Sequence, residues 1–147
     1  MSIVSPKYAI QSSIGNYFTA MQSTSGSLLS GSQYTCYTGI GNVDLASAPA
    51  IIIDGGQTRE IVAFSRCYEF STTILVKEMA ADTNALGILS QLIYNECVDS
   101  ATAAKNFSNP AYNINVWSVI TDYMEPSSDG DTIVNAITLR IIGALTP

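Results

Sequence analysis

Four carboxylates lie close together near the end of the sequence. Asp122, Glu125, Asp129 and Asp131 fall within the ten residues 122–131, and oxygen-rich loops of this kind bind hard cations such as Ca²⁺. Their spacing lacks the D-x-[DN]-x-[DN]-G pattern of an EF-hand loop. We therefore interpret 122–131 as a solvated hairpin tip, with a bound cation or a basic patch on a partner as the alternatives.

Serine is abundant, but the groups that activate a serine nucleophile are scarce. The chain has no histidine, which excludes a histidine-based triad, a histidine–metal site and a histidine general base. Neither G-x-S-x-G nor S-x-x-K occurs. Only two carboxylates brought together by folding would provide a hydrolase site. We predict no catalytic, cofactor-binding or metal-binding residues, and no enzyme.

The cysteines and aromatic residues also favour a structural role. Cys36, Cys67 and Cys97 form no CxxC motif and are too few for a disulfide scaffold, although one disulfide stays open. We expect Cys67 and Cys97 to be buried as small apolar side chains. Trp117 with Tyr34, Tyr37 and Tyr112 would form a stacking surface for sugars or bases if folding joined them, but aromatic residues more commonly fill cores and interfaces.

The composition is poor in charge for a globular chain. Charged residues make up 12% of the 147 residues, apolar residues make up 47%, and the formal net charge is −6. An acidic chain is a poor binder of nucleic acid. Protein interfaces are depleted of charge at their centres. The composition therefore favours a surface that neighbours cover in an assembly, with a compositional bias as the alternative.

Two helices are predicted from apolar periodicity. The first spans about 6–22, where apolar residues recur at helical spacing from Ile10 to Met21. The second follows the N-cap candidates Asp82-Thr83-Asn84 and ends near residue 98. The Ser/Gly-rich stretch 23–33 and the stretch 99–113 are predicted to be long loops.

Five strands are predicted from alternation and β-branched runs. Short strands cover 34–38 and 49–53, the second ending at a turn formed by Asp54-Gly55-Gly56. A long strand covers 66–78, with the even-numbered residues facing the core. Strands at 114–123 and 132–142 form an antiparallel hairpin around a polar turn, and Arg140 is expected to reach a carboxylate on a neighbouring strand or subunit.

This order of elements predicts one α+β domain over residues 1–147. The sheet should be mainly antiparallel, with about five strands and two helices packed on one face. No apolar stretch approaches the ~20 residues that span a bilayer, and the N-terminus lacks the pattern of a signal peptide. We therefore expect synthesis in a cytoplasm-like compartment and no contact with a membrane.

Three segments resemble the tail terminator, or tail completion, proteins of long-tailed bacteriophages. The run Ala48-Pro49-Ala50-Ile51-Ile52-Ile53-Asp54 is similar to their early strand, and Tyr68 to Val76 is similar to their long alternating strand. The helix with Leu86, Leu89, Leu92 and Ile93 follows in the expected place. The closing hairpin, from Ile114 to Tyr123 and from Gly130 into Ile142, looks like their final pair of strands.

The resemblance implies a structural virion protein in the neck or tail, without catalytic residues or cofactors. Six copies would form a ring that caps the tail tube, stops its polymerisation and joins it to the head-side connector protein. DNA would pass through the lumen without specific binding, which suits an acidic chain. The alternatives are a head–tail adaptor, a tail-tube subunit or a capsid decoration protein, and then a small soluble binding module.

Overall fold

The computed structural model describes residues 5–27, 29–31, 34–39, 47–61, 65–79, 87–129 and 132–146, with the backbone alone for 123–129. The helices within these ranges are α1 (Pro6–Met21), α2 (Ile88–Val98), α3 (Ser100–Phe107) and the short 3-10 helix η2 (Pro110–Tyr112). The strands are β1 (Thr35–Thr38), β2 (Ala50–Glu60), β3 (Cys67–Met79), β4 (Ile114–Asp129) and β5 (Thr132–Leu145). No helix in these ranges is long and apolar enough to cross a membrane.

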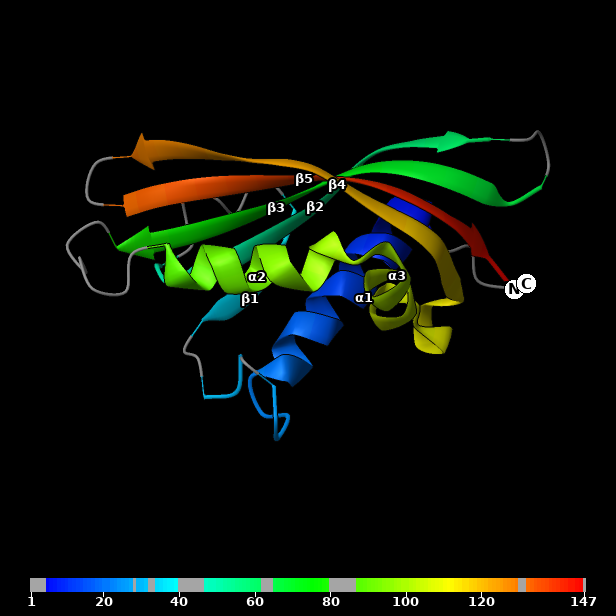
Figure 1. Ribbon diagram of the computed structural model, residues 1–147. Coiled ribbons are helices and arrows are strands. Elements are labelled where there is room, and N and C mark those ends of the chain that lie inside the picture. Colours follow the sequence, from blue (N-terminus) through cyan, green and yellow to red (C-terminus); the bar gives the residue numbers. More distant parts are fainter. Residues whose placement is uncertain are drawn as a thin grey trace.

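The strands form one twisted sheet in the order β1-β2-β3-β5-β4. β1 runs parallel to β2, and the other three pairs are antiparallel. Figure 1 shows α1, α2 and α3 together on one face of this sheet. The α+β class and the mainly antiparallel sheet are confirmed, and the closing hairpin is the β4–β5 pair.

The core lies between the helices and the sheet. The even-numbered residues of β3 face it as predicted, with Phe70, Ile74 and Val76 fully buried. They pack against apolar residues of α1 and α3, among which Phe18 and Phe107 are fully buried. Leu29, within the predicted Ser/Gly-rich loop, is also fully buried in this core. That loop is therefore anchored to its own domain at Leu29.

The predicted turn at Asp54-Gly55-Gly56 is wrong, because β2 continues through these residues to Glu60. The register between β2 and β3 shifts between Asp54 and Gln57, which marks a β-bulge. Gly56 adopts a φ of +65°, which glycine accepts without steric penalty. The two glycines therefore bend the strand without ending it.

The predicted loop at 99–113 is also wrong. Its first half forms α3, whose Ala103, Ala104 and Phe107 pack into the core, and η2 follows. The predicted polar turn is shorter than expected, because β4 continues to Asp129 and β5 begins at Thr132. α2 begins at Ile88, after Gly87, and the predicted N-cap residues 82–84 lie outside the described residues.

Candidate interaction surface

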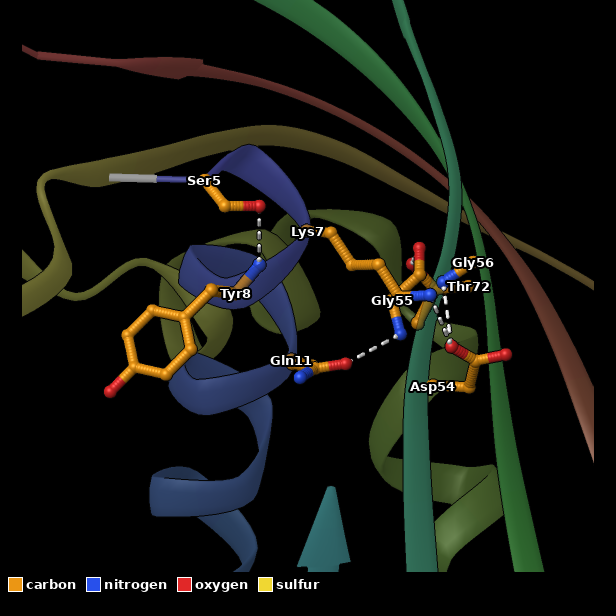
Figure 2. Close-up of polar contacts among 8 residues, drawn as sticks. All are labelled: Ser5, Lys7, Tyr8, Gln11, Asp54, Gly55, Gly56 and Thr72. Carbon is orange, nitrogen blue, oxygen red and sulfur yellow. Dashed lines mark hydrogen bonds and ion pairs between the residues drawn. The ribbon is translucent and has the colours of Figure 1, made fainter. Parts of the chain in front are cut away.

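A first polar cluster lies between α1 and the bulge of β2 (Figure 2). Lys7 Nζ lies 3.3 Å from Asp54 Oδ1, and the same carboxylate oxygen accepts the Gly56 N–H at 3.1 Å. Gln11 Oε1 accepts the Gly55 N–H at 3.2 Å. Each of these contacts joins α1 or Asp54 to the bulge.

This cluster is a joint that fixes α1 on the sheet. A Cβ atom added to Gly55 would lie 2.8 Å from both Cγ and the carbonyl oxygen of Lys7, so the glycine allows helix and strand to approach closely. On the other side, Thr72 Oγ1 donates to the Gly55 carbonyl at 3.3 Å. The bulge groups named here already have partners inside the fold, and we assign the cluster a structural role.

A second polar cluster is buried at the start of α2. Glu78 Oε2 accepts hydrogen bonds from Ser90 Oγ at 2.5 Å and Asn135 Nδ2 at 3.3 Å, and Oε1 accepts the Gly87 N–H at 3.2 Å. Asn135 Nδ2 also donates to Ser90 Oγ at 2.6 Å. This network ties α2 to β3 and β5. Ser90 is fully buried, so its hydroxyl has no access to a substrate.

The helices are joined to each other by a tyrosine. Tyr17 of α1 donates its hydroxyl to Glu96 Oε2 of α2 at 2.7 Å and accepts from Asn106 Nδ2 of α3 at 3.0 Å. Burial, followed by the hydrogen bond and charge of Glu96, raises the pKa of Tyr17 far above its ordinary value. The partly buried hydroxyl thus stays protonated and acts as a structural donor.

The face of the sheet opposite the helices is the remaining candidate, and we call it the outer face. The register places the odd-numbered residues of β3 and the even-numbered residues of β5 on it. On β4 a bulge lies between Val116 and Ser118. Since Val116 and Val119 are buried in the core, Trp117 and Ser118 both lie on the outer face.

The outer face combines exposed apolar groups with small neutral ones. The side chains of Trp117 and Ile120 are 53% and 44% exposed. Ile120 lies opposite Arg140, and the small residues Ser71, Thr73, Ser118 and Thr138 lie on the same face. An exposed tryptophan beside an exposed isoleucine is typical of protein interfaces.

Two ion pairs lie on the described part of the outer face. Arg140 Nη2 lies 3.7 Å from Asp122 Oδ1, which confirms the prediction that Arg140 reaches a carboxylate on a neighbouring strand. Arg59 Nη2 lies 3.0 Å from Glu69 Oε2, and the two residues lie directly opposite each other on β2 and β3. Lys77, also on this face, is only 7% exposed. The described side chains of this face therefore carry their charge mainly as two ion pairs.

The free edge of β4 is closed by the helical segment beside it. Ser108 Oγ accepts the Val116 N–H at 2.8 Å, and Ser100 Oγ accepts the Val119 N–H at 3.1 Å. Thr121 Oγ1 donates to the Cys97 carbonyl at the end of α2, at 2.8 Å. Farther along the strand, Pro126 has no N–H to offer a neighbour. Such devices prevent edge-to-edge pairing along this part of the strand.

The other residues singled out in the sequence do not form a common site. Tyr34 is buried and donates to the Phe18 carbonyl, and Tyr112 packs edge-on against Tyr8, so neither joins Trp117. Within the acidic segment 122–131, Asp122 is paired with Arg140, and the side chains of Glu125, Asp129 and Asp131 lie outside the described residues.

Among the cysteines, Cys97 is buried as predicted, and burial raises its thiol pKa to about 12. Cys67 is partly exposed, so the prediction of its burial is wrong, because it lies at the first residue of β3, beyond the core. All three are free thiols.

Comparison with known proteins supplies no relative for this chain: no family model and no curated protein matches it.

Proposed function

We propose that this chain is a structural virion protein of a tailed phage, and more narrowly a tail terminator. In this role it forms a ring, of six copies by the resemblance, that caps the tail tube and joins it to the head-side connector. The observation that carries the proposal is the outer face, where Trp117 and Ile120 are exposed beside paired charges. A subunit of an assembly needs such a surface to contact its neighbours.

Charge supports self-association through this face. Two copies of net charge −6 repel each other at long range. The ion pairs Arg59–Glu69 and Arg140–Asp122 are compensated within each copy and add little to this repulsion. Trp117 supplies a large apolar side chain whose burial stabilises an interface by more than the surrounding small residues do.

The net negative charge of the chain is compatible with a channel that DNA passes through. A negatively charged lumen repels the phosphate backbone and lets the duplex pass without sticking. The proposal also includes the interfaces with the tail tube protein and the head-side connector protein, as the resemblance implies. Virion location and synthesis in the host cytoplasm follow from the same role.

The proposal is tested with purified protein and polymerising tail tubes. Multi-angle light scattering should show an oligomer of the protein alone, and electron microscopy should show it at one end of each tube, with tube growth stopped. Binding to capsid faces or along the tube wall would instead support a decoration protein or a tube subunit. A strict monomer that never associates with tubes would contradict the proposal.

A further inference from the structure

The joint between α1 and the bulge of β2 contains an Asp–Gly pair, Asp54-Gly55 (Figure 2). Aspartate followed by glycine is the pair in which a protein main chain rearranges most readily to isoaspartate. Glycine favours this reaction because it has no side chain to hinder attack by its own amide nitrogen. The sequence has one other such pair, Asp129-Gly130.

The rearrangement needs no reagent except water. The amide nitrogen of Gly55 attacks Cγ of Asp54 and forms an N–Cγ bond, while one carboxyl oxygen leaves as water with the N–H hydrogen and a proton from solvent. Water then opens the resulting succinimide ring. Attack at Cγ restores aspartate, whereas attack at the main-chain carbonyl carbon of Asp54 leaves isoaspartate, in which the main chain runs through Cγ. No group is oxidised or reduced.

Both reacting groups are engaged in other contacts in the folded chain. The Gly55 N–H donates to Gln11 Oε1 at 3.2 Å, and a hydrogen bond to the N–H form opposes loss of this hydrogen. Asp54 Oδ1 lies 3.3 Å from Lys7 Nζ and accepts the Gly56 N–H at 3.1 Å. Ring closure removes the hydrogen that Gln11 accepts and the negative charge that Lys7 pairs with, so both contacts oppose the reaction.

The space around Gly55 opposes the reaction as well. Gly55 is buried, and a Cβ atom added to it would lie 2.8 Å from both Cγ and the carbonyl oxygen of Lys7. On the side of β3, Thr72 Oγ1 donates to the Gly55 carbonyl at 3.3 Å. The succinimide ring fixes the main-chain rotation at Asp54, and isoaspartate adds one carbon to the main chain. Neither product fits between α1 and β3 without moving the two elements apart.

We propose that Asp54-Gly55 is a latent site of isoaspartate formation, which the contacts of α1 suppress while the chain is folded. Gln11 has the most specific part, because it accepts the hydrogen that the attacking nitrogen must lose. The pair becomes reactive when α1 leaves the bulge. Isoaspartate at position 54 therefore marks chains in which this joint has opened, whatever assembly the chain forms.

Peptide mapping by mass spectrometry tests the proposal, because electron-transfer fragmentation distinguishes isoaspartate from aspartate. The parent chain, Gln11→Ala and Asn16→Ala are aged at neutral pH in buffer, and the parent chain is also aged in denaturing urea. Asn16→Ala is the matched control, since it removes a hydrogen bond of the same helix that does not involve the bulge, from Asn16 Nδ2 to the Tyr112 hydroxyl at 2.9 Å. Far-UV circular dichroism checks that each variant is folded in buffer.

Isoaspartate at Asp54 should form in the folded parent chain at roughly a tenth of its rate in urea or less, since a hydrogen bond and an ion pair both oppose it. Gln11→Ala should raise the rate in buffer roughly fivefold, which corresponds to one lost hydrogen bond, and Asn16→Ala should leave it unchanged. In urea, Asp129-Gly130 gives the reference rate of an unfolded Asp–Gly pair. The proposal is overturned if the parent chain reacts as fast in buffer as in urea, if Gln11→Ala does not exceed the parent chain, or if Asn16→Ala reacts as fast as Gln11→Ala.

Discussion

A methyl group at Gly56 would collide with the neighbouring strand. The added Cβ would lie 1.7 Å from the carbonyl oxygen of Ser71, roughly 2 Å closer than an ordinary contact, and Gly56 has a φ of +65°. At Gly26, where φ is +86°, nothing lies within 4 Å of an added Cβ. The two glycines therefore share a left-handed backbone but differ in the space beside it.

The difference predicts the size of each effect. Alanine at Gly26 bears only the penalty of the left-handed conformation, about 1 kcal/mol. Alanine at Gly56 bears this penalty and also forces β2 away from Ser71, which breaks about two sheet hydrogen bonds worth ~1 kcal/mol each. We therefore expect Gly56→Ala to lower the free energy of unfolding by about 3 kcal/mol or more.

Urea denaturation followed by far-UV circular dichroism measures both variants. The expected result is a small decrease in the unfolding midpoint for Gly26→Ala and a decrease about three times larger for Gly56→Ala. Equal decreases would refute the reasoning, because they would mean that β2 and β3 do not approach closely at the bulge.

Three further predictions concern stability. Gly15→Ala should raise the free energy of unfolding by about 0.5–1 kcal/mol, because alanine favours a helix and its Cβ would lie at an ordinary contact distance of 3.6 Å from its neighbours. A decrease in a urea titration would show that there is no space for a methyl group between α1 and the sheet. Glu78→Ala should lower the free energy of unfolding by about 2–3 kcal/mol, because the buried Ser90 hydroxyl and the partly buried Gly87 N–H lose their acceptor and Asn135 keeps only Ser90. Glu69→Ala, at a partly exposed ion pair, should change it by under 1 kcal/mol, and similar losses for the two variants would contradict the network. Burial raises the pKa of the Cys97 thiol from 9.0 to about 12, so the unfolded chain loses this proton first and the free energy of unfolding should fall as pH rises from 9 towards 12. In Cys97→Ala, the unfolding midpoint should fall less steeply across this pH range, and an unchanged slope would contradict the burial of the thiol.

The sequence predicts the main elements well where periodicity is strong. The alternation of β3 and the apolar recurrence in α1 each reflect one face against a single core, so their bounds and buried faces are confirmed. Apolar periodicity does not reveal α3, because Ser100–Phe107 has only eight residues and its buried face is largely alanine. β2 was cut short because Gly55-Gly56 is also typical of a turn, and only the pairing with β3 distinguishes a bulge.

The interaction surface was only partly predictable. Low charge indicates a covered surface, but it does not say which one. The pairing of Arg59 with Glu69 depends on register across two strands, and the outward position of Trp117 depends on a bulge in β4. The closure of the β4 edge depends on Ser100 and Ser108, which lie in a segment predicted to be a loop. Long-range contacts of this kind appear only in the folded chain.

The central claim is that this chain is an assembly subunit that ends a phage tail. Its most direct test is electron microscopy of tails assembled with the protein, without it, and with Trp117→Arg. We predict tails of uniform length with a ring at one end in the first case, and tails of uncontrolled length in the other two. Tails of normal length and structure in the absence of the protein would contradict the claim.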